Sequence, residues 1–134
     1  MKVLALDYGS ARTGVAVSDP TGTIARPFGV VERAASEDGL ERLARIVRDE
    51  GAERVVVGLP LTLRGEHGAQ ARETEAFVEA LRAQVAVPVE SFDERFTTAL
   101  AAQSRSGSSS APEDARAAAH LLESYLQWSS SSDA

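Results

Sequence analysis

The sequence predicts an α/β fold with a mixed five-stranded sheet, three antiparallel strands plus two parallel ones, flanked by helices. Three apolar runs lie close together within residues 3–31 with no helical pattern between them. Helical periodicity then alternates with two further apolar runs, which is the order typical of parallel β-α-β units. The 134 residues fit one domain. We therefore expect a single domain over residues 1–128 and a disordered polar tail over residues 129–134.

The first three strands are expected to pair in sequence. Residues 3–6 are apolar and end in a turn, and residues 13–18 are rich in β-branched side chains, which favours a hairpin. Residues 24–31 form the third strand, and Pro27 favours an edge position because proline has no N–H for the ladder. The first strand should then be central, with the fourth strand parallel beside it.

The first helix is expected over Glu37–Glu50. Ser36 is a suitable N-cap, and Gly51 is suited to ending the helix. The continuous apolar run at residues 55–57 follows, and such a run is typical of a strand buried on both faces of a parallel sheet.

The second half of the chain repeats this alternation. A glycine-rich loop leads to a helix over residues 70–85, then a strand over residues 88–92 and a helix over residues 97–104. The serine-rich segment at residues 104–111 is expected to be mobile. The last helix starts near Pro112, which suits a first turn, and runs to about residue 128.

Composition excludes several classes of protein. The chain has no cysteine, so it has no disulfide, thiol nucleophile or cysteine-bound metal. No apolar stretch approaches the roughly 18–20 residues of a spanning helix, and we expect a cytoplasmic protein with no membrane partner. The net charge of -6 argues against binding nucleic acid by bulk electrostatics, but it permits an enzyme whose acids hold a metal.

Acidic residues occur where elements of the predicted sheet end or begin. Asp7 ends the first strand, Glu94 with Asp93 ends the last strand, and Asp114 starts the last helix. Ligands of open sheets gather beyond the carboxyl ends of the strands. Carboxylates brought together there repel one another unless a cation intervenes, and hard oxygen ligands suit Mg²⁺ or Mn²⁺. Alone, each acid has an ordinary reading as turn or helix-start chemistry, but the set favours two-metal phosphoryl transfer.

Four segments closely resemble the YqgF/RuvX family, the Holliday-junction-resolvase-like proteins also described as pre-16S ribosomal RNA nucleases. The segments are LDYGSARTGVAVSD from Leu6, VVVGLPLTLRGEHGAQA from Val55, FDERFTTALA from Phe92 and EDARAAAHLLESYL from Glu113. The resemblance covers nearly the whole chain, with four motifs in the same order and spacing as in the family.

The resemblance implies a ribonuclease-H-like nuclease domain, a cytoplasmic location and a role in processing the 5′ end of 16S ribosomal RNA. The catalytic and metal-binding acids of the family fall on Asp7, Glu94 and Asp114, with Asp93 adjacent as a further ligand. The carboxylate chemistry predicts Mg²⁺ or Mn²⁺ as the cofactor, as two ions, and in the hydrolysis that we predict Asp7 would bridge them while Glu94 and Asp114 would hold one each.

Three further positions are candidate substrate-binding residues. Gly9 would let a phosphate or ion approach the backbone, since it has no Cβ. Arg12 and Arg95 would either hold phosphate in a bidentate manner or pair with nearby acids. His67 and His120 have no second ligand at suitable spacing and are interpreted as residues that bind no metal.

The chain departs from the family in residues 106–113, where family members carry lysine and arginine before the last acid. Each lost phosphate contact removes nearly one counterion's worth of salt-dependent affinity. We therefore expect weak binding to nucleic acid by the chain itself, or reliance on Arg64, Arg72 and Arg105 or on a partner. The partner favoured by this departure is pre-16S ribosomal RNA within a ribosomal particle, bound by a monomer or weak homodimer.

Two alternatives to the RNA nuclease stay open. One is a Holliday-junction resolvase that acts on branched DNA in recombination or repair. The other is a non-catalytic ribosome-assembly factor, against which the presence of all three acids argues. A sugar-kinase or actin-like ATPase is excluded by length, because such proteins need two domains to enclose the nucleotide.

Overall fold

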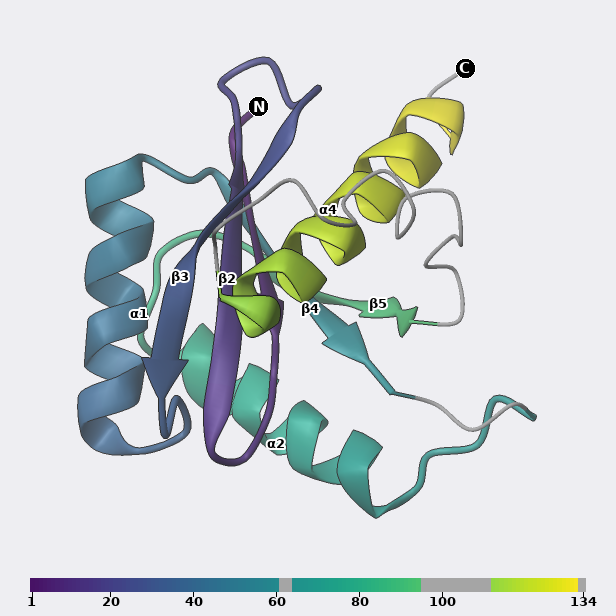
Figure 1. Ribbon diagram of the computed structural model, residues 1–134. Helices are drawn as coiled ribbons and strands as arrows, with labels where there is room; N and C mark the ends of the chain where they lie inside the picture. The colour runs from purple at the N-terminus through teal and green to yellow at the C-terminus, as the bar shows by residue number, and fades with distance from the viewer. Residues whose placement is uncertain (61–63, 95–111, 133–134) are drawn as a thin grey trace.

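The computed structural model describes residues 1–60, 64–94 and 112–132, and Figure 1 shows a single sheet with helices on both faces. The sheet has five strands in the order β3-β2-β1-β4-β5. β1 pairs with β2 in antiparallel and with β4 in parallel orientation. The strands are β1 (Val3–Asp7), β2 (Arg12–Ser18), β3 (Ala25–Glu32), β4 (Arg54–Leu59) and β5 (Val89–Asp93).

The expected strand arrangement is confirmed. β1 is central, β4 lies beside it in parallel, and β5 continues the parallel side. β3 is an edge strand, and its Pro27 lies opposite Ala16 where the register of the β2–β3 ladder shifts. Proline is tolerated in an edge strand, because such a strand pairs on one side only and the missing N–H of the proline need not belong to the ladder.

Alternating side chains of β1 bury two separate cores. Leu4 and Leu6 pack on the face covered by α1 (Glu37–Glu50) and α2 (Ala69–Arg82). Val3 and Ala5 pack on the opposite face, which α4 (Glu113–Ser132) covers. Figure 1 shows α4 lying across that face, and α4 packs on β1, β2 and β3.

α1 begins and ends where the sequence predicts. The Ser36 hydroxyl accepts a hydrogen bond from the Gly39 N–H at 3.0 Å, which satisfies one unpaired donor of the first turn. Gly51 has a φ of 67° and its N–H bonds back to the Arg48 carbonyl, as in a glycine-terminated helix. The apolar stripe of α1 is buried as expected.

Two helices end at other positions than expected. α2 ends at Arg82, three residues early, where the N–H groups of Gln84 and Val85 turn back to the Leu81 carbonyl. α4 continues to Ser132, four residues beyond the expected end and into the expected tail, since no glycine or proline interrupts it. The predicted helix over residues 97–104, the serine-rich segment and residues 133–134 lie outside the described residues.

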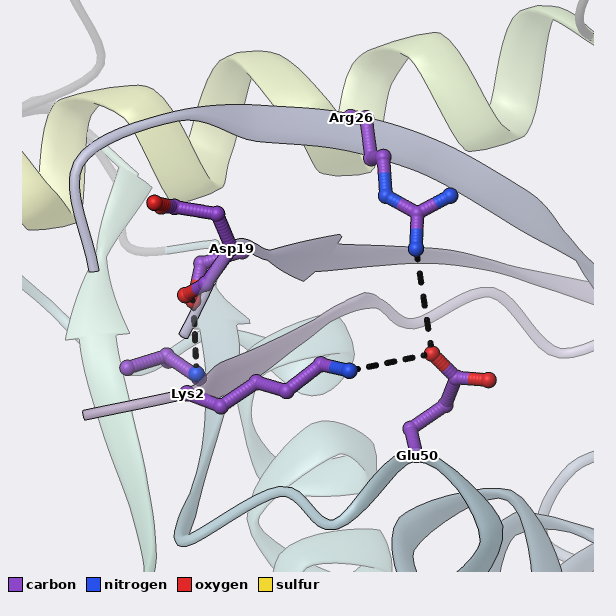
Figure 2. A network of polar contacts seen from close by, with 6 residues as sticks. Lys2, Asp19, Arg26 and Glu50 are labelled. Atoms are coloured by element: carbon purple, nitrogen blue, oxygen red, sulfur yellow. Dashed lines mark hydrogen bonds and ion pairs between the residues drawn. The ribbon is translucent and has the colours of Figure 1, made fainter. Parts of the chain in front are cut away.

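Polar contacts hold the start of β1 against the end of α1 (Figure 2). Lys2 Nζ and Arg26 Nη2 lie 3.5 and 3.9 Å from the same carboxylate oxygen of Glu50. The N-terminal ammonium donates to the Pro20 carbonyl at 2.9 Å. These contacts lie at the amino end of β1, the opposite end from the predicted site. No helix among the described residues combines the length and apolar character needed to cross a bilayer.

Candidate active site

Two of the predicted acids meet at the carboxyl end of the parallel strands. Asp7 is the last residue of β1, and Glu94 directly follows β5. β1, β4 and β5 run parallel, so their carboxyl ends share one edge of the sheet. There the Asp7 and Glu94 side chains are joined by a hydrogen bond.

The two acids line a cavity of about 280 Å³ beneath α4. The helix contributes Ala117, His120 and Leu121 to the wall. Ligand-binding sites are typically concave and partly apolar with a few polar groups, and this cavity has that character.

The surroundings of the two acids favour their protonated forms. Burial is the main cause that raises the pKa of Asp7, the charge of Asp114 adds to it, and the hydrogen bond with Glu94 opposes it. Burial, followed by the Asp7 charge, raises the pKa of Glu94 to about 7. Below about pH 7 the pair therefore holds a proton, which offsets the repulsion between the two carboxylates.

Asp114 lies close enough for its charge to act on Asp7, but its carboxylate contacts a cation. Its Oδ2 atom is 3.3 Å from Nε of Arg12. Gly14 places this end of α4, because a Cβ on Gly14 would lie only 1.8 Å from the Asp114 carbonyl oxygen. Only glycine at this position of β2 lets the helix approach so closely.

Asp93 completes the group of acids. It ends β5, it is half-buried, and its charge contributes to the raised pKa of Glu94. Across residues 1–60, 64–94 and 112–132, no three acidic or histidine side chains are arranged as a preformed metal site. Asp7 and Glu94 are bonded to each other, and Asp114 faces Arg12.

The predicted substrate-binding residues have local roles in the structure. A Cβ on Gly9 would lie 2.5 Å from the Arg12 carbonyl oxygen, so the tight β1–β2 connection itself requires the glycine. Arg12 pairs with Asp114, which is one of its two expected roles. Arg95 lies outside the described residues.

Sequence reasoning missed the role of Gly58. A Cβ at this position of β4 would lie 2.7 Å from Glu94 Oε1 and 3.0 Å from Leu121 Cδ2. Gly58 therefore provides the space that the Glu94 side chain occupies. A glycine interrupting an otherwise β-branched buried strand was the signal in the sequence, because such glycines often mark a close approach.

A second missed feature is a clamp on the residues that follow Asp7. The Tyr8 and Ser10 hydroxyls donate to the same oxygen of Glu73 in α2, at 2.8 and 2.6 Å. The Tyr8 ring stacks on Phe77, with the ring centroids 4.5 Å apart. The connection after Asp7 is thus fixed to α2 by two hydrogen bonds and a ring contact.

Curated proteins of known name are similar to this chain in sequence. A relative from Chloroflexus aggregans, named "Putative pre-16S rRNA nuclease", is 48% identical over 101 residues, which span 75% of this chain and 71% of the relative. A relative of the same name from Rubrobacter xylanophilus is 45% identical over 131 residues, 94% of this chain and 92% of that one.

Among solved structures, RuvC of T. thermophilus in complex with a Holliday junction substrate superposes with a TM-score of 0.70. The match covers 98% of this chain and 96% of that one at 16% identity. This likeness confirms the expected ribonuclease-H-like fold. The family model described as "RuvX: Holliday junction resolvase" matches residues 1–128. With this match and relatives up to 48% identical, the chain belongs to the RuvX family.

Proposed function

We propose that this chain is a metal-dependent nuclease that processes the 5′ end of the 16S ribosomal RNA precursor in the cytoplasm. Its catalytic carboxylates are Asp7, Glu94 and Asp114, within a nuclease domain over residues 1–128. The names of its relatives support the substrate. The observation that carries the proposal is the Asp7–Glu94 contact in a cavity where the charge of Asp114 also acts.

The residues around the cavity fit a divalent cation. Asp7, Glu94, Asp114 and Asp93 offer only carboxylate oxygens, the ligands that Mg²⁺ and Mn²⁺ prefer. Burial is the main cause that raises the pKa values of Asp7 and Glu94, and the charges of neighbouring carboxylates raise them further. A divalent cation offsets the repulsion between these carboxylates with more charge than a proton does, so it should displace the proton that the pair holds.

The four acids would hold two Mg²⁺ or Mn²⁺ ions, which supply activation of a water and stabilisation of the leaving 3′ oxygen. The protein groups orient the phosphodiester for this hydrolysis. Arg12 forms an ion pair with Asp114, one of the proposed catalytic acids. A substrate phosphate would compete with Asp114 for the Arg12 guanidinium. Release of Asp114 from Arg12 would free that carboxylate for the cations. Substrate and metal binding would then be coupled through Arg12.

The test is cleavage of a 5′-extended 16S precursor with Mg²⁺ or Mn²⁺, by wild type and by Asp7→Asn. We expect the wild type to shorten the 5′ extension and the variant to leave it intact. Equal cleavage by both proteins would remove Asp7 from the proposed chemistry. No cleavage by either protein, with the ribosomal particle also supplied, would favour the assembly-factor reading instead.

A second candidate function is resolution of four-way DNA junctions. The description of the matching family as Holliday junction resolvases favours it, and the ribonuclease-H-like fold is compatible with it. A synthetic four-way junction run beside the RNA distinguishes the two. Symmetrical cleavage of the junction together with an intact RNA would assign the chain to branched DNA.

A further inference from the structure

Several basic residues at the amino end of the sheet lie in ion pairs, and three basic residues at its carboxyl end do not. At the amino end of β1, Lys2 and Arg26 share Glu50 (Figure 2). Arg54 at the start of β4 pairs with Glu90, and Arg82 at the end of α2 pairs with Glu79. At the carboxyl end, Arg33, Arg64 and Arg72 make no ion pair with a carboxylate of the described residues.

Arg33 is held beside the connection between β1 and β2. It follows β3 directly, and its N–H donates to the Ala11 carbonyl at 3.0 Å. Its own carbonyl accepts from the N–H and the hydroxyl of Ser36, at 2.9 and 2.7 Å. The next residue after Ala11 is Arg12, which contacts Asp114 of the site. The backbone of Arg33 is therefore hydrogen-bonded to the residue that precedes Arg12, the ion-pair partner of Asp114.

The conformation of Arg33 is unusual for its residue type. Its φ is 48°, and within the described residues no other non-glycine residue has a positive φ. This left-handed conformation costs an arginine roughly 1 kcal/mol, and asparagine or glycine adopts it more easily. A residue kept there with an exposed side chain is a candidate for a role other than folding.

Arg72 lies in α2, which covers the other face of the sheet from α4. It lies in the first turns of α2, with its side chain exposed. The next residue, Glu73, accepts the hydrogen bonds from Tyr8 and Ser10, which follow Asp7. Arg33 therefore contacts residues 8–11, the segment that follows the proposed catalytic acid, and Arg72 directly precedes a residue that contacts the same segment.

We propose that Arg33 and Arg72 bind phosphates of the nucleic acid strand that Asp7, Glu94 and Asp114 act on. This inference rests on the proposed function. An exposed guanidinium without a carboxylate partner binds phosphate at little cost, because no ion pair must first be broken. The chain as a whole carries a net charge of -6, so attraction to a polyanion must come from cations placed locally. The two arginines supply that attraction at the edge where the acids lie.

The test compares two double variants that remove the same charge from opposite places. Arg33→Asn with Arg72→Gln alters the proposed phosphate contacts, and asparagine keeps the left-handed conformation accessible. Arg42→Gln with Arg48→Gln alters two exposed arginines of α1 that also lack an ion pair among the described residues. Both pairs lower the net charge equally, so only location distinguishes them.

Binding of a fluorescein-labelled single-stranded RNA and of a labelled four-way DNA junction is measured by anisotropy in EDTA, across a salt series. For the RNA, each phosphate contact contributes about 0.7 to the slope of log Kd against log salt, so the site pair should lower that slope by about 1.4. The α1 pair should leave the slope at the wild-type value. The two probes show whether an RNA or a DNA strand carries the phosphates.

Equal loss of slope in both double variants would overturn the inference, because the effect would then be one of total charge. A wild-type slope in the Arg33→Asn, Arg72→Gln double variant would also overturn the inference. If the wild-type protein still cleaves the 5′-extended precursor, that outcome leaves the proposed function standing. Failure of the wild type to bind either probe would overturn the inference, whereas the proposed function is decided separately by cleavage of the 5′-extended precursor with the ribosomal particle supplied. Thermal unfolding of each variant, and of the single Arg33→Asn and Arg72→Gln variants, verifies that the compared proteins are folded.

Discussion

Asp7 and Glu94 are hydrogen-bonded across a strand that lies between their own. Asp7 ends β1 and Glu94 follows β5, and β4 separates these two strands in the sheet. The side chains reach each other because Gly58 of β4 has no side chain in the space that Glu94 occupies. The candidate site thus depends on three strands, each contributing one residue at its carboxyl end.

Asp7→Asn should abolish cleavage while leaving the protein equally or more stable. Burial and the charge of Asp114 both disfavour an ionised Asp7, and the amide removes that charge with almost no change in shape. We expect cleavage to fall on the order of 10²–10⁴-fold, measured on the 5′-extended precursor, and the melting temperature to stay level or rise. Asp49→Asn, on the exposed side of α1, is the control and should cleave normally. A clear fall in melting temperature would instead make Asp7 a structural residue.

The stability of the metal-free protein should decrease as pH rises towards and through neutrality. Glu94 has its pKa raised from 4.5 to about 7, so between these values the folded state binds more protons than the unfolded state. The stabilisation that the proton provides is complete below pH 4.5 and is lost as pH rises through about 7. The measurement is melting temperature against pH in EDTA. Glu94→Gln mimics the protonated side chain and should flatten the curve, and a wild-type curve matching that of the variant would contradict the prediction.

Most of the fold could be predicted from local sequence patterns. Strand order followed from three paired strands and two β-α-β units, and the limits of α1 followed from Ser36 and Gly51. Where the sequence has no glycine or proline to end a helix, the prediction was less accurate. The serine run that ends α4 looked like a polar tail, but the helix continues through it to Ser132 because nothing stops its propagation.

The candidate site was only partly predictable. Motif positions placed Asp7 and Glu94 at one edge of the sheet, and the structure brings them into contact. A glycine within a buried strand signals a close approach, but the groups that approach Gly58 and Gly14 come from separate elements, and no local pattern identifies them. The clamp by Glu73 is likewise a contact between residues more than sixty positions apart.

Gly58→Ala should reduce cleavage by displacing Glu94. The new methyl group would lie 2.7 Å from Glu94 Oε1 and 3.0 Å from Leu121 Cδ2, so the Glu94 carboxylate must shift from its position beside Asp7. We expect roughly 1–3 kcal/mol of destabilisation from overpacking, together with loss of cleavage beyond what the stability change explains. Gly29→Ala is the matched control, a strand glycine in β3 whose Cβ would contact nothing within 4 Å. Wild-type cleavage by a folded Gly58→Ala protein would show that the position of Glu94 tolerates this shift.

The clamp on the β1–β2 connection should contribute to cleavage through the position of Asp7. Tyr8→Phe keeps the ring stacked on Phe77 but removes the hydroxyl that donates to Glu73, and Glu73→Gln weakens the acceptor for both Tyr8 and Ser10. Because Glu73 is exposed, each single change should cost little stability, within about 1 kcal/mol. We expect each to lower kcat more than it raises KM, and the double variant to lose less than the sum of the two, since both remove the same hydrogen bond. Glu79→Gln, on the exposed face of the same helix, is the control for loss of a carboxylate. Additive losses in the double variant would mean that Tyr8 and Glu73 act separately. An unchanged kcat in Tyr8→Phe, in Glu73→Gln and in the double variant would mean that Asp7 holds its position without the clamp.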